Sequence, residues 1–299
     1  MKRKSFFKKI NIFIYHNLNK FVNTKYCSSF LYRVYFITLS YLRKRSRIQL
    51  SKGKDFFLID EEINKFEKIQ WAFPNSLRLR CLINYHNGLK NRGFQLSNDY
   101  SIDKIKFNNH DIIIDCGSNL SDLLLYLGSL NLELSYHSIE PGKEEAITNK
   151  LNLKNENFSK INKQFHEFAL AERNELKTFY YAPQNANSSL VLSDDYKLTY
   201  KVKSITLDRF SEIAKLSNKN VKLLKLEAEG LEPEILKGSK NFLKNIEYIA
   251  ADLGPERGIN KECTLAEVTS ILTKNNFEML DFNYPRITAL FHNKLFVKI

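Results

Sequence analysis

The sequence contains few glycines, and their placement excludes two common nucleotide-binding motifs. Only 10 of the 299 residues are glycine. A dinucleotide fingerprint needs the spacing G-x-G-x-x-G so that the backbone can approach a pyrophosphate closely. The turn after the apolar residues 112–114 holds a single glycine, Gly117, and no phosphate-binding lysine follows it. A ligand with a nucleoside but without a phosphate therefore fits this turn better.

Cysteine and regularly spaced histidine are also scarce. Cys27, Cys81, Cys116 and Cys263 are far apart in the sequence and form no C-x-x-C pair. The six histidines show no spacing typical of metal ligands. We therefore expect no zinc site, no other tightly bound metal and no dense disulfide framework, and a reducing cytoplasm is the natural location.

Long apolar runs are missing as well. No run reaches the roughly 18 apolar residues that a membrane-spanning helix needs. Residues 10–18 are interrupted by Asn11, His16 and Asn17, and no small-residue cleavage site follows them. This segment therefore does not have the pattern of a signal peptide.

Acidic residues are absent from residues 1–54, which hold 14 of the 46 lysines and arginines. This arm therefore carries essentially the whole net charge of +13. Apolar and aromatic residues recur at helical spacing in residues 6–21 and 31–42, which predicts two amphipathic helices. Such helices suit an anionic membrane surface, here the inner face of a membrane, but the same stripes equally suit packing on the main domain or on a second subunit. Nucleic acid is the weaker alternative because no RNA- or DNA-binding module is recognised.

An apolar strand that ends in an acid stands at residues 111–119, DIIIDCGSN. The strand ends at Asp115, turns through Gly117 and enters a helix, and a second acid, Glu140, ends the next apolar run. A carboxylate at such a strand end can accept hydrogen bonds from both hydroxyls of a ribose. The pattern favours S-adenosylmethionine, whose ammonium group Asp115 would attract. For the turn alone, the alternative is an ordinary buried strand whose aspartate caps the next helix.

Four stretches, in this order, resemble the FkbM-type family of S-adenosylmethionine-dependent methyltransferases. They are DIIIDCGSN, SIEP (138–141), TLDRF (206–210) and LLKLEAEGLEPEILKG (223–238). The resemblance implies a Rossmann-like methyltransferase sheet and O-methylation, often of sugars in glycans, lipopolysaccharides or secondary metabolites. Ser121 stands where the family usually has glycine, which predicts weaker cofactor affinity. Glu227 stands where the family usually has aspartate, which predicts a catalytic geometry shifted by one methylene.

Three groups of site residues follow from the motifs and the strand ends. Cofactor-binding residues are expected at Asp115, Gly117, Ser118, Asn119, Glu140, Pro141 and Ala169. Substrate-binding residues are expected at Ser188, Ser189, Asp252 and Arg257. The alternatives are an ordinary exposed hairpin loop for the two serines and a capped turn through Gly254 and Pro255 for Asp252 and Arg257. Glu227 is favoured as the base or as a group that orients the acceptor, and Glu229 as a structural or cofactor-side group. The alternative for both acids is that they only favour the positive end of the following helix.

Apolar runs of strand length alternate with helical stretches from residue 111 onward, which is typical of a parallel α/β sheet. Strands are predicted over residues 112–115, 136–140, 164–169, 221–227, 246–252 and 277–282, with a C-terminal hairpin of residues 287–291 and 295–298. A polar insertion over residues 177–203 predicts two strands around a loop at residues 184–189. The predicted fold is a mostly parallel, Rossmann-like methyltransferase sheet with a C-terminal antiparallel hairpin, preceded by a helical extension.

Three segments are predicted along the chain. Residues 1–54 form the basic arm, residues 55–100 a helical lead-in and residues 101–299 the S-adenosylmethionine-binding domain. Within the lead-in, helices are expected over residues 60–74 and 77–90, leading through residues 91–93 into a loop. Trp71 is expected in the core.

Three classes of function remain open from the sequence. The leading one is a cytoplasmic, S-adenosylmethionine-dependent O-methyltransferase that acts on a sugar hydroxyl of a glycan, lipopolysaccharide or related metabolite. The second is a non-catalytic, membrane-associated module with a degenerate cofactor site, for which Ser121 and Glu227 are the arguments. The third is a nicotinamide-dependent oxidoreductase, which the single glycine of the turn disfavours. The sequence identifies neither the acceptor nor the oligomeric state.

Overall fold

The computed structural model describes residues 47–297, except 53–55, 65–66, 75–82, 86, 183–187, 193–195 and 285. The two amphipathic helices predicted for the arm lie outside the described residues. Among the described residues, no helix is both long and apolar enough to cross a membrane.

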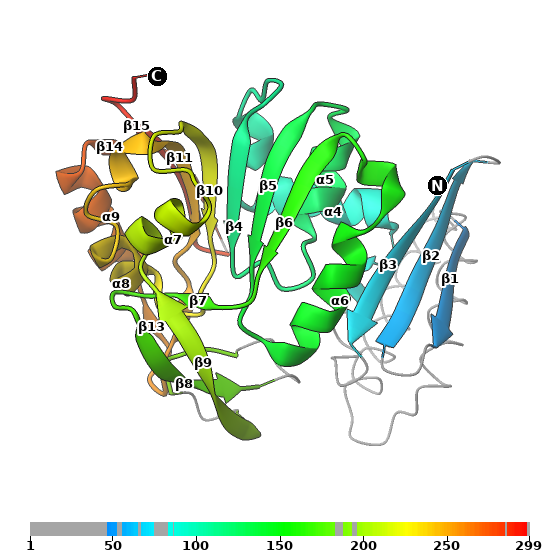
Figure 1. Cartoon of the computed structure of the whole chain (residues 1–299), viewed down its shortest axis with the longest axis horizontal. Coiled ribbons are helices and arrows are strands. Elements are labelled where there is room, and N and C mark those ends of the chain that lie inside the picture. Colours follow the sequence, from blue (N-terminus) through cyan, green and yellow to red (C-terminus); the bar gives the residue numbers. More distant parts are fainter. Residues whose placement is uncertain are drawn as a thin grey trace, which may run out of the picture.

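A seven-stranded sheet forms the centre of the molecule (Figure 1). Its strands are β4 (Ile112–Cys116), β5 (Leu134–Ile139), β6 (Ile161–His166), β10 (Val221–Leu226), β11 (Ile246–Asp252), β14 (Phe277–Asn283) and β15 (Thr288–Asn293). Their order across the sheet is β14-β15-β11-β10-β4-β5-β6, and only β15 runs antiparallel to its neighbours. The chain proceeds outward from β4 to β6 and then returns to β10. In such sheets ligands bind at the carboxyl ends of the strands, where the strand order reverses.

The mostly parallel α/β sheet predicted from the sequence is therefore confirmed. All six predicted strands are present, and the third is divided between β6 and the short β7 (Ala169–Leu170), which belongs to another sheet. The partners predicted for the C-terminal hairpin are wrong, because β15 continues through His292 and Asn293 and pairs with β14 and β11. The reason is burial: residues 288–291 are all buried, as expected for a strand between two others, and β11 and β14 occupy both sides of β15.

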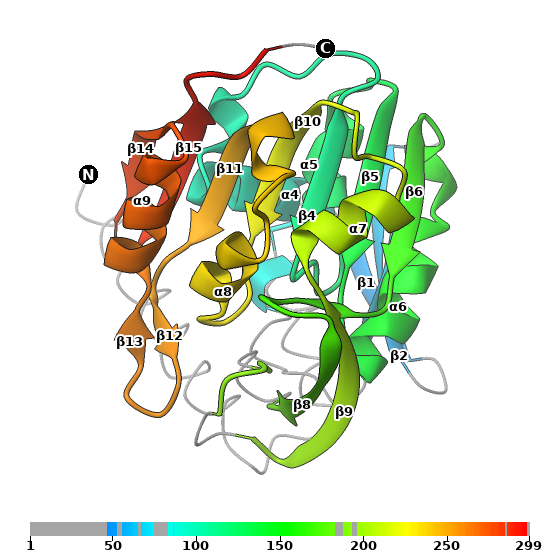
Figure 2. The same ribbon diagram turned by 60° about the vertical axis from the view of Figure 1, so that its left-hand side comes forward.

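Helices cover both faces of this sheet (Figure 2). One face carries α4 (Leu89–Asp99), α5 (Leu123–Ser129) and α6 (Lys143–Leu153), and the other carries α7 (Leu207–Ile213), α8 (Glu232–Lys237) and α9 (Leu265–Lys274). Each face of the sheet has its own hydrophobic core, and successive residues of a strand point to opposite faces. Leu223 packs in the core on the side of α4, α5 and α6, and Leu224 packs in the core on the side of α7, α8 and α9. This alternation follows from the two-residue period of a strand.

The N-terminal extension is built from strands and not from the predicted helix over residues 60–74. β1 (Arg47–Lys52), β2 (Phe56–Asn64) and β3 (Glu67–Pro74) form an antiparallel sheet beside α6 (Figure 1). Ile69 and Phe73 are four residues apart and so fit a helix as well as a strand. Trp71 resolves the ambiguity because it is buried on the same side as both, which requires a period of two.

The second predicted helix, over residues 77–90, lies partly outside the described residues. Within them, α4 begins only at Leu89, after Gly88 with a φ of 107°, and it includes residues 91–93, which were expected to lead into a loop. Gly93 is tolerated there because α4 lies directly on α5. A Cβ at Gly93 would be 2.5 Å from the backbone nitrogen of Tyr126. Glycine inside a helix costs about 1 kcal/mol relative to alanine, so this close packing accounts for its presence.

The extension shares its core with the main sheet. Trp71 is fully buried, as predicted, and its ring meets Phe158 edge-on. Asn152 of α6 binds both backbone groups of Ala72 in β3, through hydrogen bonds of 2.6 and 3.1 Å. These contacts fix the extension to the helix that follows β5.

Short elements complete the fold. As predicted, the insertion after β7 contains two antiparallel strands, β8 (Glu175–Tyr181) and β9 (Leu198–Ile205), and they extend beyond the carboxyl ends of the central strands (Figure 2). A second small hairpin consists of β12 (Pro255–Arg257) and β13 (Glu262–Cys263). Single 3-10 turns lie at η1 (Ile83–Tyr85), η2 (Ile102–Lys104), η3 (Glu156–Phe158) and η4 (Leu243–Asn245).

Candidate functional site

A cavity of about 260 Å³ lies where the strand order reverses. Of the residues predicted from the sequence, it is lined by Asp115, Gly117, Ser118, Asn119, Glu140, Pro141, Ala169, Ser188, Ser189, Glu227 and Glu229. Asp252 and Arg257 do not line it. The structure thus brings together all predicted cofactor-binding and catalytic residues, which come from β4, β5 and β10, from the segments after them and, for Ala169, from β7.

Gly117 determines the shape of the turn after β4. Its φ is 69°, in the left-handed region that favours glycine. A Cβ at this position would lie 1.6 Å from the backbone oxygen of Glu227. The turn therefore fits against the end of β10 only because residue 117 has no side chain.

Glu140 lies at the end of β5, directly opposite this turn. One carboxylate oxygen accepts a hydrogen bond from the Asn119 N–H at 2.9 Å, and the other accepts one from the Gly142 N–H at 2.8 Å. Each carboxylate oxygen has a further lone pair. The carboxylate can therefore hold the turn and still accept hydrogen bonds from a ribose.

Ser121 is fully buried and does not line the cavity. Its φ is 63°, so this position keeps the left-handed conformation for which the family uses glycine. Its hydroxyl donates to the side-chain oxygen of Asn149 at 2.9 Å and lies 2.9 Å from the Ser138 hydroxyl. Asn149 in turn donates to the Asn119 carbonyl oxygen at 2.9 Å. Ser121 thus supports the turn from behind instead of obstructing the ligand, which argues against a disabling role.

Asp115 is buried between two donors. Its carboxylate accepts hydrogen bonds from the Tyr136 hydroxyl at 2.5 Å and from Lys225 Nζ at 3.0 Å. Burial raises the pKa of Asp115, and the ammonium of Lys225 opposes that change. Because Lys225 already compensates its charge, Asp115 is a weaker anchor for a second ammonium than the sequence suggested.

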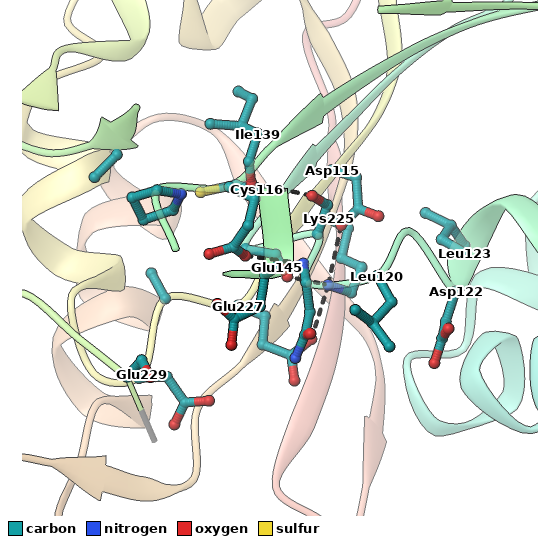
Figure 3. Close-up of a pocket in the computed structure, with 18 of the residues that line it drawn as sticks. Asp115, Cys116, Leu120, Asp122, Leu123, Ile139, Glu145, Lys225, Glu227 and Glu229 are labelled. Atoms are coloured by element: carbon teal, nitrogen blue, oxygen red, sulfur yellow. Dashed lines mark hydrogen bonds and ion pairs between the residues drawn. The ribbon is translucent and has the colours of Figure 1, made fainter. Parts of the chain in front are cut away.

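Glu227 lies between two cations, of which Lys225 is visible beside it in Figure 3. One of its oxygens is 2.8 Å from Lys225 Nζ, and the other accepts a hydrogen bond of 2.7 Å from Arg286 Nη2. Burial alone would raise the pKa of Glu227, but Lys225 and Arg286 outweigh it and hold the pKa at about 2. A carboxylate held in this way is a weak base, contrary to the preference derived from the sequence.

Glu229 has the opposite environment. Its Oε2 atom is buried and has no hydrogen-bond partner among the described residues. Burial, the charge of Glu256 and then that of Glu227 raise the pKa of Glu229 well above its ordinary value. A carboxyl group with a raised pKa is a stronger base once it is ionised. Glu229 is therefore better suited to accept a proton than Glu227.

The turn that carries Glu229 is held by another acid. Glu232, at the start of α8, accepts hydrogen bonds from the N–H groups of Ala228 at 2.8 Å and Gly230 at 3.2 Å. Glu232 lies in the first turn of α8 and thus supplies an acid at the positive end of this helix, which was the alternative role for Glu227 and Glu229. The side chain of Glu229 remains available to the cavity.

Neither Asp252 nor Arg257 is placed to contact a ligand in the cavity directly. Asp252 accepts a hydrogen bond from the Gly254 N–H and pairs with Arg286 at 3.1 Å, so its influence passes through Arg286. Arg257 forms a two-pronged pair with Glu234 on α8. Their expected role in substrate binding is therefore not supported by their positions.

The serine pair at the insertion does reach the cavity. Ser189 donates to the backbone oxygen of Glu229 at 3.1 Å, and the Ser188 hydroxyl accepts a hydrogen bond from the Ala182 N–H at 2.9 Å. The insertion is thereby fixed beside the acid that we regard as the base.

Residues from the extension and the first helices also line the cavity and were missed. They include Phe73, Tyr85, Arg92, Leu96, Asp122 and Leu123, and the strand interior and C-terminal part add Lys225 and Arg286. Lys225 had a signal in the sequence, since a lysine among the leucines of a strand must meet acids when it is buried. The others are far from the recognised motifs in the sequence.

The switch-point cavity, the glycine turn and the acid at the second strand end define a nucleoside-binding α/β protein without a phosphate site. Residues 115–279 match the family described as "Methyltransferase FkbM domain". The chain therefore belongs to the FkbM methyltransferase family, and its cofactor is S-adenosylmethionine. A nicotinamide cofactor is thereby set aside.

Comparison with solved structures finds distant similarities. The N-terminal domain of human METTL16 in complex with S-adenosylhomocysteine is 13% identical, with a TM-score of 0.42, over 88% of this chain and 94% of that one. A methyltransferase from Aquifex aeolicus is 12% identical, with a TM-score of 0.38, over 68% of this chain and 96% of that one. TrmK from M. capricolum, also with S-adenosylhomocysteine, is 12% identical, with a TM-score of 0.37, over 68% of this chain and 69% of that one. No curated protein matches the chain.

Proposed function

We propose that this methyltransferase transfers the methyl group to a hydroxyl of a sugar, in a glycan, a lipopolysaccharide or a related metabolite. The observation that carries the proposal is the buried carboxyl oxygen of Glu229 at the cavity, which has no hydrogen-bond partner in the part of the chain that the structure describes. An alcohol is a poor nucleophile until a base accepts its proton, whereas stronger nucleophiles need no such base. A base with a raised pKa next to the cavity is therefore most useful for an alcohol acceptor.

The proton and electron balance of this step is simple. When bound, S-adenosylmethionine supplies an electrophilic methyl group on a positively charged sulfur. The cofactor would be held by the turn after β4 and by Glu140, and the transfer would join its methyl carbon to the acceptor oxygen and leave the electron pair of the carbon–sulfur bond on a neutral sulfur. Glu229 takes the hydroxyl proton, a contribution of about 10²- to 10⁴-fold in rate.

Glu227 has a supporting role in this proposal. With a pKa of about 2 it stays ionised, and it holds Lys225 and Arg286 in place beside the cavity. Ser188 and Ser189 lie on the insertion side and would offer polar contacts to a hydroxylated acceptor.

A label-transfer assay tests this function. The full chain is incubated with methyl-labelled S-adenosylmethionine and a set of amino-free oligosaccharides and lipopolysaccharide fragments. We expect label in methyl ethers, which survive both acid and base treatment. Label on nitrogen or sulfur would contradict the hydroxyl acceptor. Cofactor binding without transfer to any hydroxyl acceptor would favour the non-catalytic alternative.

We also propose that the basic arm, residues 1–54, brings the enzyme to anionic membranes, where a lipid-linked acceptor would be concentrated. The support is the excess of basic and aromatic residues in the arm. Deletion should stop before Arg47, because residues 47–52 form β1 and pair with β2. In liposome flotation, we expect the full chain to float with anionic vesicles and the chain lacking residues 2–42 to stay behind. Equal flotation of the two would contradict the proposal.

A further inference from the structure

The residues that line the cavity form three groups, and the roles proposed so far involve only two of these groups. Glu140 serves the nucleoside at the end of β5, and Glu229 serves the acceptor after β10. The third group comes from the extension, α4 and the start of α5, including Tyr85, Arg92 and Asp122. In Figure 3, Asp122 and Glu229 lie on opposite sides of Lys225. This third group is therefore separate from the residues on the acceptor side.

S-adenosylmethionine carries an α-carboxylate at the end opposite its nucleoside, and this anion needs a cationic partner when it is removed from water. Among the described residues, three cations line the cavity. Lys225 is already placed between Asp115 and Glu227, at 3.0 and 2.8 Å. Arg286 is already bound to Glu227 and Asp252, at 2.7 and 3.1 Å. Arg92 is the third.

Arg92 uses only one of its side-chain nitrogens in a hydrogen bond to another described residue. Its Nε donates to one oxygen of Asp122 at 2.8 Å. No hydrogen bond joins its two terminal nitrogens to another described residue, although the side chain is only 14% exposed. A guanidinium has five N–H donors, so four of them remain, in the planar arrangement that matches a carboxylate.

Asp122 fixes the orientation of this guanidinium. Besides Arg92 it accepts hydrogen bonds from Trp71 Nε1 at 3.0 Å and from the Tyr85 hydroxyl at 2.7 and 2.8 Å. The Tyr85 ring also lies 5.9 Å from the Arg92 guanidinium. The extension therefore helps to position Arg92 on the wall of the cavity.

From these contacts we infer that Arg92 binds the α-carboxylate of S-adenosylmethionine through its two terminal nitrogens, with Asp122 as a positioning residue. The inference rests on the cofactor assignment and assigns a role to the extension, which becomes part of the cofactor site. α4 can present Arg92 here because Gly93, the next residue, lets the helix lie against α5.

The test compares two ligands that differ in the amino-acid portion. S-adenosylhomocysteine carries the α-carboxylate, and 5′-methylthioadenosine lacks the whole amino-acid end. Both are titrated calorimetrically into the full chain, into Arg92→Gln and into Arg92→Lys, with the surface variant Arg209→Gln as control. We expect Arg92→Gln to lower the affinity for S-adenosylhomocysteine by about 10- to 100-fold, as for the loss of a charged hydrogen-bonded pair. The affinity for 5′-methylthioadenosine should not change, and Arg92→Lys should fall between.

The ratio of the two affinities separates recognition from folding. A variant that merely loosens the cavity would weaken both ligands equally and lower the melting temperature, and this result would overturn the inference. Unchanged S-adenosylhomocysteine affinity in Arg92→Gln would also overturn it. Failure of the unmodified chain to bind S-adenosylhomocysteine would instead contradict the cofactor assignment.

Discussion

Replacing Gly117 with alanine is expected to remove cofactor binding and methyl transfer. The added Cβ would lie 1.6 Å from the backbone oxygen of Glu227, so either the turn or the end of β10 must move. Both carry site residues, and a displacement of about 1 Å can cost about 100-fold in rate. Titration with S-adenosylhomocysteine and the label-transfer assay measure the two losses.

Gly258 offers a matched control for this variant. Its φ is also 69°, but a Cβ there would meet no atom of the described residues closer than 3.6 Å. Gly258→Ala therefore carries only the cost of a left-handed side chain, about 1 to 2 kcal/mol, and should retain cofactor affinity. If Gly117→Ala behaved like Gly258→Ala, the close contact with Glu227 would not be what requires glycine at this turn.

Changing Glu229 to glutamine is expected to abolish most turnover while cofactor affinity stays the same. The amide keeps the shape of the side chain but cannot take the acceptor proton, so the rate should fall by about 10²- to 10⁴-fold. Glu227→Gln is a less specific change, because it leaves Lys225 and Arg286 without a shared partner, and we expect it to lower both stability and turnover. If Glu229→Gln retained normal turnover with a hydroxyl acceptor, Glu229 would not be the base.

The pH dependence gives the same residue a second signature. The pKa of Glu229 is raised, so the carboxyl group keeps its proton at pH values where an ordinary glutamate is ionised. Only the ionised form accepts a proton, and kcat/KM should therefore rise with pH beyond the ordinary range for glutamate. Glu256→Gln removes the neighbouring acid that contributes most to this shift after burial. In that variant the rise should move to lower pH, whereas in Glu229→Gln it should disappear.

The sequence predicted the parts of the fold that depend on local pattern. The alternation of strands and helices from Asp111 onward, the mostly parallel sheet and the family were confirmed, because apolar runs of strand length alternate with helical stretches and the family motifs stand at the ends of β4, β5 and β10. The extension was predicted wrongly because Ile69 and Phe73 satisfy helical and extended periods alike. The decision came from tertiary packing, in which Trp71 is buried on the same side of β3.

The site was predicted where its residues belong to motifs and missed where the fold brings distant residues together. Gly117, Glu140 and Glu229 stand in recognisable stretches, and all three line the cavity. Arg92 and Arg286 stand in no motif. They reach the cavity only because α4 packs on α5 and because the chain enters β15 just after Arg286. The relative basicity of Glu227 and Glu229 was equally beyond the sequence, since it depends on Lys225 and Arg286 as partners.

The cofactor site itself is tested most directly by calorimetric titration of the full chain with S-adenosylmethionine, S-adenosylhomocysteine and NAD. Glu140→Ala is the variant, and Glu156→Ala, at an exposed acid of η3, is the control. The structure predicts binding of both sulfur ligands and not of NAD, with about a 10- to 100-fold loss in Glu140→Ala as hydrogen bonds to the carboxylate are removed. No binding of either sulfur ligand to the unmodified chain, or equal affinity in Glu140→Ala, would contradict the site described here.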